Sequence, residues 1–302
     1  MKLIVITGPT AVGKTTAAIV LAERLHCHIV NADSRQVYRG MPIATAAPTA
    51  AELARVPHHL VGTKELDQPY NAWLYEQDVM ALLPQLWAQS DTVVLCGGSM
   101  MYVDAVCNGI DDMPDISPEV RQAVKQQLAE QGLPSLVAEL ERLDPTLAAT
   151  IDRHNTVRVC HAVEVCRQTG LPYSTLRTGQ RKPRPFEIVK IGLNLERAEL
   201  YDRINRRVEA MVAAGLEDEA RRLLPLRHLN ALNTVGLKEM FAYLDGTWDR
   251  DTAIERIKKN TRVYAKKQLT WLQRDTAITW CEPQNCLETV ISRVTIHRFL
   301  RD

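Results

Sequence analysis

The sequence predicts an α/β fold in which helices flank a parallel sheet and a helical insertion interrupts the core. In the first third of the chain, short β-rich runs alternate with helical patterns, which is typical of parallel strands joined by helices. A helical stretch without strands follows, and strand character then returns. The pattern divides the chain into 1–112 (first part of the core), 113–185 (helical insertion) and 186–302 (remainder of the core, with basic C-terminal helices).

The individual elements follow from local hydrophobic patterns and helix-start signals. In the first part, strands are expected at 3–7, 28–32 and 92–96, and helices at 14–25 and 73–88. Ser117 is typical of a helix N-cap with Pro118 at the first helical position, and helical character continues to about Gly170. The later elements are a strand at 188–195, amphipathic helices at 200–213 and 253–272, and a short strand at 277–280.

The composition is that of a globular protein with no global attraction for a polyanion. Of the 302 residues, 46% are hydrophobic and 24% are charged, which excludes intrinsic disorder. The formal net charge is +1, so any affinity for nucleic acid must come from local clusters of charge. No apolar run reaches the roughly 18 residues of a membrane-spanning helix. Seven cysteines without an export signal indicate free thiols, so we expect a cytoplasmic protein and take a monomer as the default state.

A phosphate-binding motif lies between the first predicted strand and the first predicted helix. It matches GxxxxGK[ST] in full and consists of Gly8, Pro9, Thr10, Ala11, Val12, Gly13, Lys14 and Thr15. Backbone N–H groups and the helix dipole favour phosphate oxygens in such a loop. Lys14 supplies a charge to the terminal phosphates, and the Thr15 hydroxyl is a ligand for Mg²⁺. The motif predicts a P-loop NTPase-like core that binds a di- or triphosphate with Mg²⁺ as cofactor.

A single carboxylate, Asp33, is expected near this loop. The strand at 92–96 ends in Cys96 without the acid that usually holds Mg²⁺ in P-loop ATPases. Asp33 follows the strand at 28–32, and ligands of open α/β sheets bind outside the carboxyl ends of strands. The carboxylate could position Mg²⁺ or accept a proton from an attacking nucleophile. The alternative is a helix cap or turn residue.

Several further blocks carry a resemblance to a known family. They occur in one order along nearly the whole chain: 33–41 (DSRQVYRGM), 45–49, 97–102 (GGSMMY), 155–165, 200–204 (LYDRI), 235–239 (VGLKE) and 260–272 (NTRVYAKKQLTWL). Together with the phosphate loop, they resemble the tRNA dimethylallyltransferases, also called isopentenyl-tRNA transferases. The resemblance implies transfer of a dimethylallyl group from dimethylallyl diphosphate to N6 of the adenosine 3′ of the anticodon, in tRNAs that read codons beginning with U.

The resemblance also implies roles for individual residues. The phosphate loop with Lys14 would hold the leaving diphosphate, and ATP hydrolysis is not part of the reaction. Asp33 would take the proton from the adenine amine as the C–N bond forms. Ser99 stands where the family usually has threonine, and its hydroxyl would donate to the bridging oxygen of the donor. Arg203 is the expected additional diphosphate ligand.

A basic stripe marks the expected nucleic-acid surface. It contains no acid between its ends and comprises Arg256, Lys258, Lys259, Arg262, Lys266, Lys267 and Arg274. Such a stripe on a nearly neutral protein is a local footprint for phosphates. Tyr264 and Trp271 lie within it, and we expect Trp271 to pack in the core.

Position in the family implies a set of tRNA contacts. They are Asp33, Ser34, Arg35, Gln36, Ser99, Arg121, Val157, Arg158, His161, Asn233, Gly236, Lys238, Arg262, Lys266 and Lys267. Three positions depart from the usual pattern, because arginine is usual at His161, tyrosine at Leu237 and often arginine at Asn233. The departures affect the detail of the contacts with the anticodon loop, and the reaction itself does not depend on them.

Three other functions share part of these features. A related isopentenyltransferase prenylates free AMP or ADP, but the basic stripe and the helical insertion favour a polynucleotide acceptor. A small-molecule kinase also combines a phosphate loop with an acid, but has no use for a long basic helix. A non-catalytic RNA-binding module would not need Lys14, Thr15 and Asp33 together.

Overall fold

The computed structural model describes residues 1–112 and 114–299, which form two compact units. Unit 1 comprises Met1–Cys107 and Arg184–Asp302, and unit 2 comprises Asn108–Pro183. The sequence places the insertion at 113–185, so unit 2 begins slightly earlier than the predicted boundary. Each unit is described below by itself.

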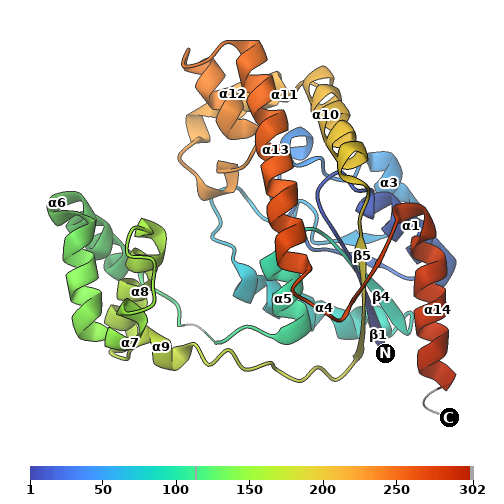
Figure 1. The fold of residues 1–302 in the computed structure, drawn as a ribbon, viewed down its shortest axis with the longest axis horizontal. Coiled ribbons are helices and arrows are strands. Elements are labelled where there is room, and N and C mark those ends of the chain that lie inside the picture. Colours follow the sequence, from blue (N-terminus) through green and yellow to red (C-terminus); the bar gives the residue numbers. More distant parts are fainter. Residues whose placement is uncertain (113, 300–302) are drawn as a thin grey trace. The chain divides into compact units, whose positions relative to one another are not determined.

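A six-stranded parallel sheet forms the centre of unit 1 (Figure 1). Its strands are β1 (Lys2–Thr7), β2 (Ile29–Asn31), β3 (His58–His59), β4 (Thr92–Cys96), β5 (Glu187–Leu193) and β6 (Ile278–Cys281). Their order is β3-β2-β4-β1-β5-β6, and every neighbouring pair is parallel. The predicted parallel sheet is confirmed. The sequence pattern misses the two-residue strand β3.

Helices cover both faces of this sheet. They are α1 (Lys14–Leu25), α2 (Pro42–Thr45), α3 (Ala50–Arg55), α4 (Ala72–Trp87), α5 (Met100–Asn108), α10 (Arg197–Ala213), α11 (Leu216–Leu223), α12 (Leu237–Leu244), α13 (Arg250–Leu272) and α14 (Cys286–Phe299). Short 3-10 turns lie at Leu224–Leu226, Asn230–Leu232 and Pro283–Asn285. The predicted helices at 14–25, 73–88, 200–213 and 253–272 are confirmed, with ends that differ by a few residues at most.

The alternation of side chains along β1 divides the core of unit 1 between the two faces of the sheet. Leu3 and Val5 pack in a cluster that includes buried residues of α4 and α5. Ile4 and Ile6 pack in a second cluster with buried residues of α1 and α14. Successive side chains of a strand point to opposite faces, so this one strand anchors both layers. The layers hold the carboxyl ends of β1, β2 and β4 at one edge of the sheet.

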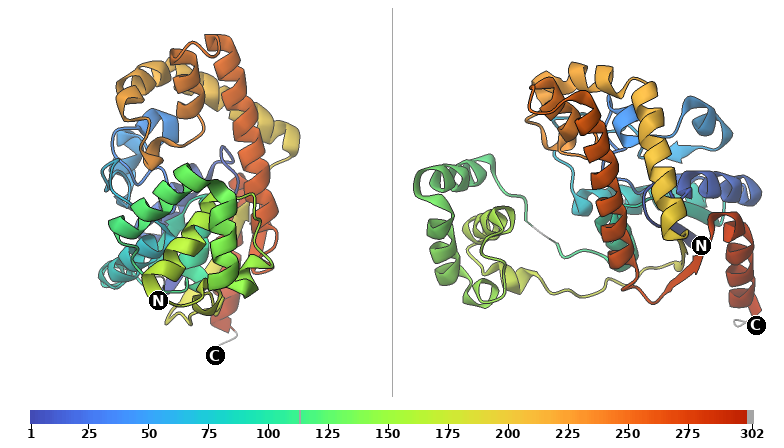
Figure 2. Two further views of the ribbon diagram at one scale, coloured as in Figure 1. Left: turned by 90° about the vertical axis from the view of Figure 1, so that its left-hand side faces the viewer. Right: turned by 45° about the horizontal axis from the view of Figure 1, so that its top comes forward.

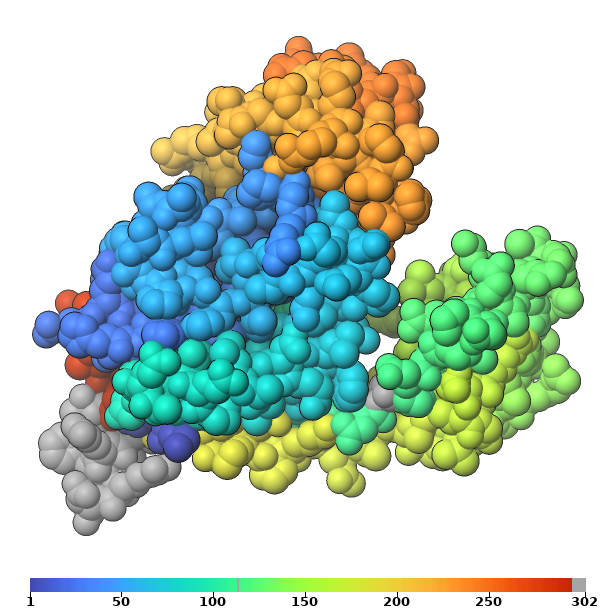
Figure 3. All heavy atoms as spheres, turned by 180° about the vertical axis from the view of Figure 1, so that it is seen from behind, coloured from blue at the N-terminus to red at the C-terminus, as the bar shows by residue number. Residues whose placement is uncertain are grey.

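The segment around α2 lies beside α11 on the face of unit 1 drawn in Figure 3. The buried carboxylate of Glu219 in α11 accepts hydrogen bonds from the backbone N–H groups of Ile43 (3.0 Å) and Ala44 (2.8 Å). Burial raises the pKa of Glu219, although these two hydrogen bonds act in the opposite direction. Arg222 donates to the carbonyl of Gly40 at 2.9 Å. These contacts attach the segment after β2 to the C-terminal helices.

Unit 2 is helical, as the sequence predicts. It contains α6 (Pro118–Leu143), α7 (Pro145–Ala148), α8 (Thr156–Thr169) and α9 (Tyr173–Leu176), and α6 packs beside α8 (Figure 2). The predicted N-cap is confirmed, because the Ser117 hydroxyl accepts from the backbone N–H of Val120. α6 is kinked at Gly132, whose φ of 76° lies in the left-handed region that glycine tolerates, two residues before Pro134.

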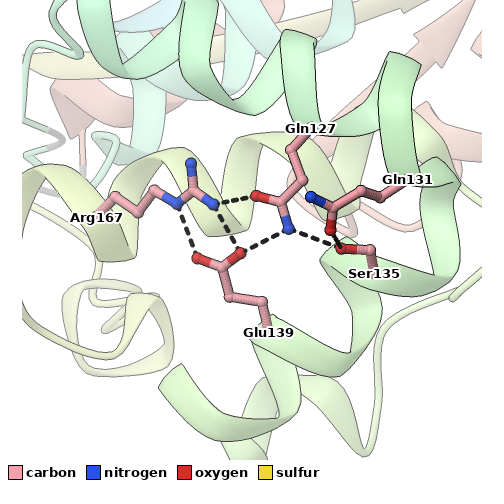
Figure 4. A network of polar contacts seen from close by, with 5 residues as sticks. All are labelled: Gln127, Gln131, Ser135, Glu139 and Arg167. Carbon is pink, nitrogen blue, oxygen red and sulfur yellow. Dashed lines mark hydrogen bonds and ion pairs between the residues drawn. The ribbon is translucent and has the colours of Figure 1, made fainter.

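A polar network joins the two halves of α6 to α8 (Figure 4). Arg167 donates to both carboxylate oxygens of Glu139 at 2.7 Å and also to Gln127. Gln127 in turn donates to Ser135 and Glu139, and Ser135 donates to Gln131. The Arg167 hydrogen bond lowers the pKa of Glu139. The network therefore holds the kink in a fixed geometry.

The state of the cysteines and the absence of a long apolar helix, both expected from the sequence, can be compared with the described part of the chain. All seven cysteines lie in it, and each is a free thiol. None of the helices between residues 1 and 299 is long and apolar enough to cross a lipid bilayer.

Candidate active site

The phosphate loop lies between the end of β1 and the first residue of α1, as predicted. Gly8 follows β1 with a φ of 144°, and a Cβ at this position would lie 2.4 Å from the carbonyl oxygen of Leu193 in β5. Only glycine fits so close to the neighbouring strand. Gly13 precedes Lys14, the first residue of α1. A Cβ on Gly13 would lie 3.2 Å from Nη2 of Arg203, so this guanidinium lies directly beside the loop.

Contacts within the loop differ in part from the predicted arrangement. Nζ of Lys14 donates to the carbonyl of Pro9 at 2.8 Å, and burial lowers the pKa of this ammonium group to about 8. The backbone N–H of Thr10, expected to face phosphate, donates instead to Oε1 of Gln268 at 2.8 Å. The backbone N–H of Val12 donates to the carbonyl of Pro9 at 3.4 Å. The loop is therefore held from within and from α13.

Asp33 follows β2, at the same edge of the sheet as the loop. Its Oδ1 accepts hydrogen bonds from the backbone N–H groups of Arg35 (2.8 Å) and Gln36 (3.2 Å). The alternative interpretation of Asp33 as a turn residue is thus correct for its Oδ1. Asp33 also lines two cavities.

Two adjoining cavities meet at Asp33. The first has a volume of about 600 Å³, and its lining includes Lys14, Thr15 and Arg203. The second has a volume of about 300 Å³, and its lining includes Ser34, Asn233 and Lys238. Four residues line both: Thr10, Asp33, Arg207 and Tyr264. The phosphate loop thus opens on one side of Asp33, and residues predicted to contact tRNA lie on the other.

Sequence reasoning does not select Arg207 or Tyr264, although both lie at this junction. Burial lowers the pKa of Arg207, and the nearby Asp33 carboxylate raises it. Burial and Asp33 raise the pKa of Tyr264 to about 12, so its hydroxyl is neutral at pH 7. The sequence does contain a feature that could have selected Arg207. It lies four residues after Arg203, and this spacing places both side chains on one face of α10.

Ser99 is buried after β4, and the structure joins it to the Asp33 loop. Its Oγ accepts from the backbone N–H of Ser34 at 2.7 Å and donates to the Ser34 hydroxyl at 3.1 Å. Ser99 is not among the described residues that line the two cavities. Its donation to a bridging oxygen therefore stays a prediction, and its observed contacts position the neighbouring loop.

Comparisons with known proteins show the family of the chain. The family profile described as IPP transferase matches residues 36–275 of the chain. The chain belongs to the IPP transferase family. It is 53% identical over 282 residues to tRNA dimethylallyltransferase 2 of Parabacteroides distasonis, covering 93% of this chain and 94% of that one. It is 55% identical over 282 residues to tRNA dimethylallyltransferase 1 of Bacteroides thetaiotaomicron, covering 93% and 92%.

Solved structures give the same result for the fold of this IPP transferase. The full-length tRNA isopentenylpyrophosphate transferase of Bacillus halodurans matches with a TM-score of 0.70 and 36% identity, over 99% of this chain and 95% of that one. A eukaryotic dimethylallyltransferase, described as acting on tRNA, matches with a TM-score of 0.77 and 25% identity, over 90% and 69%. The predicted P-loop NTPase-like fold is confirmed.

Several residues predicted to contact tRNA in this IPP transferase are already engaged by the protein. The guanidinium of Arg35 donates to the carbonyls of Asn230 (2.8 Å), Ala231 (3.1 Å) and Asn233 (3.1 Å). The Gln36 amide donates to the carbonyls that close α2, at residues 45 and 46. Gly236 is buried, and so is the neighbouring Leu237. Arg35 and Gln36 therefore fix loops, whereas Asn233 and Lys238 are exposed beside the second cavity.

The basic stripe of α13 is only partly available to a ligand. Lys266 and Lys267 are exposed, and among the described residues neither has an acidic partner. Lys258 is paired with Glu209 (3.0 Å) and Glu255 (2.9 Å). Arg262 donates to Oδ1 of Asn205 in α10 at 2.6 Å. Among the described residues, exposed cations without an acidic partner lie in both halves of the helix, since Arg256 and Lys259 are exposed as well.

The prediction that Trp271 packs in the core is wrong. Its side chain is 36% exposed, and its Nε1 donates to Oδ2 of Asp104 in α5 at 2.9 Å. The guanidinium of Arg274 lies over the same ring, 5.6 Å from its centre. An indole N–H needs a polar partner, and Asp104 supplies one near the surface. The helical spacing alone does not distinguish this position from a core position.

The remaining predicted tRNA contacts lie in unit 2. Arg121 of α6 is exposed, and so are Val157, Arg158 and His161 of α8. Val157 is 79% exposed, which is unusual for an apolar side chain. Partial desolvation by neighbouring groups and the charge of Arg121 lower the pKa of His161, whereas Glu164 raises it. His161 is therefore a neutral neighbour of Arg121 on this surface at pH 7.

The first cavity fits the expected Mg²⁺. The residues described contain no group of three or more His, Cys, Asp or Glu side chains that could hold a metal ion by themselves. Mg²⁺ commonly takes few protein ligands and completes its shell with phosphate oxygens and water. Thr15 and Asp33 both line the first cavity and supply oxygens of the required kind.

Proposed function

We propose that this IPP transferase is a tRNA dimethylallyltransferase. It transfers a dimethylallyl group from dimethylallyl diphosphate to N6 of the adenosine adjacent to the anticodon on its 3′ side, in tRNAs that read codons beginning with U. Membership of the family and the names of relatives at 53% and 55% identity support the proposal. The structural observation that carries it is the position of Asp33 at the junction of the two cavities.

The first cavity is the proposed donor site. Lys14, Arg203 and Arg207 place positive charge around it, beside the glycine loop. An allylic C–O bond breaks when the negative charge of the departing diphosphate is stabilised, and preorganised charges do this most effectively in a partly buried site. Bound Mg²⁺, held by Thr15 and water, would supply further charge to the diphosphate oxygens.

The second cavity is the proposed acceptor site. A base in a structured anticodon arm must leave its stack to reach a buried reacting group. An adenine that enters beside Ser34 and Asn233 meets Asp33 at the wall shared with the donor site. As N6 attacks the allylic carbon, the C–N bond forms, the C–O bond breaks and the Asp33 carboxylate takes the N6 proton. The products are prenylated tRNA and diphosphate.

The proposed tRNA surface uses charges that the protein does not neutralise itself. In unit 1 they include Lys238, Lys266 and Lys267. In unit 2, Arg121 and Arg158 are exposed on neighbouring helices. We assign no partner in a membrane. The cytoplasmic location and the monomeric state stay predictions.

The proposal is tested by offering two acceptors to the purified protein, with a control that contains neither. Labelled dimethylallyl diphosphate is incubated with Mg²⁺ and unmodified tRNA, with AMP, or with neither. We expect label only in tRNA, at the adenosine 3′ of the anticodon, with release of diphosphate. Label in AMP alone would identify an adenylate isopentenyltransferase. Transfer of phosphate from ATP to a metabolite, without any prenyl transfer, would identify a kinase.

A further inference from the structure

Gln268 is a buried polar residue of α13 that contacts two loops of the active site. Its side chain is 2% exposed. Oε1 accepts from the backbone N–H of Thr10 in the phosphate loop at 2.8 Å, and Nε2 donates to the carbonyl of Gly98 after β4 at 2.8 Å. Both ends of the amide are therefore used on backbone groups, and the two loops belong to adjacent strands, β1 and β4.

The packing around this amide is tight on the side of the donor site. A Cβ on Gly98 would lie 2.5 Å from Nε2 of Gln268, 3.3 Å from the carbonyl oxygen of Gly8 and 3.4 Å from Nζ of Lys14. The Gln268 amide and the Lys14 ammonium group thus meet at the same backbone position. Gln268 also belongs to the lining of the first cavity.

Two other residues of α13 lie on the same side of the helix as Gln268. Tyr264, one turn before, lines both cavities. Trp271, one turn after, donates to Asp104 in α5. Residues spaced by three or four positions share one face of a helix. This face of α13 therefore serves the active site, and Gln268 is its contact with the phosphate loop.

We propose that Gln268 is a positioning residue that holds the phosphate loop in its diphosphate-binding conformation. The inference rests on the proposed function, because it assigns the donor diphosphate to that loop. Removing the amide leaves the partly buried Thr10 N–H and the buried Gly98 carbonyl without their partners. The loop then adopts its diphosphate-binding conformation for a smaller fraction of the time, and donor affinity falls in proportion to this fraction. The tRNA surface of α13 is unchanged.

The test compares Gln268→Met with Gln273→Met. Methionine has a similar length but neither donates nor accepts like an amide, and Gln273 is an exposed glutamine at the end of the same helix. The dissociation constant of inorganic pyrophosphate is measured by calorimetry, together with kcat and the KM values for dimethylallyl diphosphate and tRNA. In Gln268→Met we expect the pyrophosphate dissociation constant and the donor KM to rise about tenfold, with the tRNA KM unchanged. Gln273→Met behaves as wild type.

A second variant and a stability measurement complete the design. Gln268→Asn keeps an amide but is one methylene shorter, so it cannot span both loops, and we expect a several-fold rise in the same two constants. Circular dichroism and Tm report the folding of each variant. Wild-type pyrophosphate affinity in a folded Gln268→Met or Gln268→Asn protein, even with a lowered Tm, would overturn the proposal. The pyrophosphate comparison is independent of prenyl transfer, which tests the proposed function separately.

Discussion

The hydroxyl oxygen of Ser99 accepts a 2.7 Å hydrogen bond from the backbone nitrogen of Ser34 and donates to the Ser34 hydroxyl at 3.1 Å. This pair connects the loop after β4 with the loop after β2. Ser34 directly follows Asp33, whose Oδ1 is itself fixed by two backbone N–H groups. Hydrogen bonds therefore fix the proposed proton acceptor at its own carboxylate and at the residue that follows it.

Replacing Ser99 should disturb catalysis more than donor binding. Ser99→Ala leaves the partly buried Ser34 N–H without its acceptor, so we expect the Asp33 loop to shift and kcat to fall about tenfold. Ser99→Thr keeps the oxygen and should retain near wild-type kcat. Pyrophosphate affinity, measured by calorimetry, should stay the same in both. Equal kcat for Ser99→Ala and wild type would show that this contact does not position the acceptor.

The exposed lysines of α13 should contribute to tRNA affinity in a salt-dependent way. The double variant Lys266→Gln/Lys267→Gln removes two free charges, so the slope of log affinity against log salt should decrease by about 1.4 if both contact phosphates. The matched control is Lys258→Gln, because Lys258 is already paired with Glu209 and Glu255. Filter binding over a range of salt gives each slope. An unchanged slope for the double variant would place the tRNA elsewhere.

The lowered pKa of Lys14 predicts a loss of donor affinity in alkaline solution. With a pKa of about 8, the ammonium group is charged below that pH and neutral above it. A bound diphosphate favours the charged form, so affinity should fall by up to about tenfold per pH unit above pH 8. Calorimetry measures the pyrophosphate affinity at each pH. The same measurement on Lys14→Met gives the part of the pH dependence that comes from ionisation of pyrophosphate itself. Parallel pH profiles for the two proteins would contradict the role of Lys14.

Much of the fold could be predicted from sequence because its signals are local. The strand before Gly8 and the helix after Gly13 flank a motif whose backbone geometry admits few alternatives. The N-cap at Ser117 is likewise visible in its own segment. The strand β3, His58–His59, is too short for any periodicity, and it forms only by pairing with β2. The hydrogen bonds from Arg167 of α8 to the two halves of α6 likewise join segments that are distant in the sequence.

The candidate site could be predicted only in part, since several of its contacts join distant segments. Asp33 and Lys14 occur in recognisable blocks, so the sequence selects them. Gln268 meets Thr10 across 258 positions of the chain, and nothing in its own segment signals this contact. The backbone contacts of Arg35 also depend on a distant loop. A charge in a motif can thus serve the protein's own backbone as well as a ligand.

The central claim is that the Asp33 carboxylate accepts the proton of the attacking amine. Asp33→Asn tests it with least disturbance, because an amide oxygen can still accept the two N–H bonds that fix this turn. The direct measurement is the single-turnover rate of prenyl transfer to tRNA, with pyrophosphate and tRNA affinities measured on the same preparation. We predict a rate at least about 100-fold below wild type with both affinities unchanged. A near wild-type rate in Asp33→Asn would contradict the account.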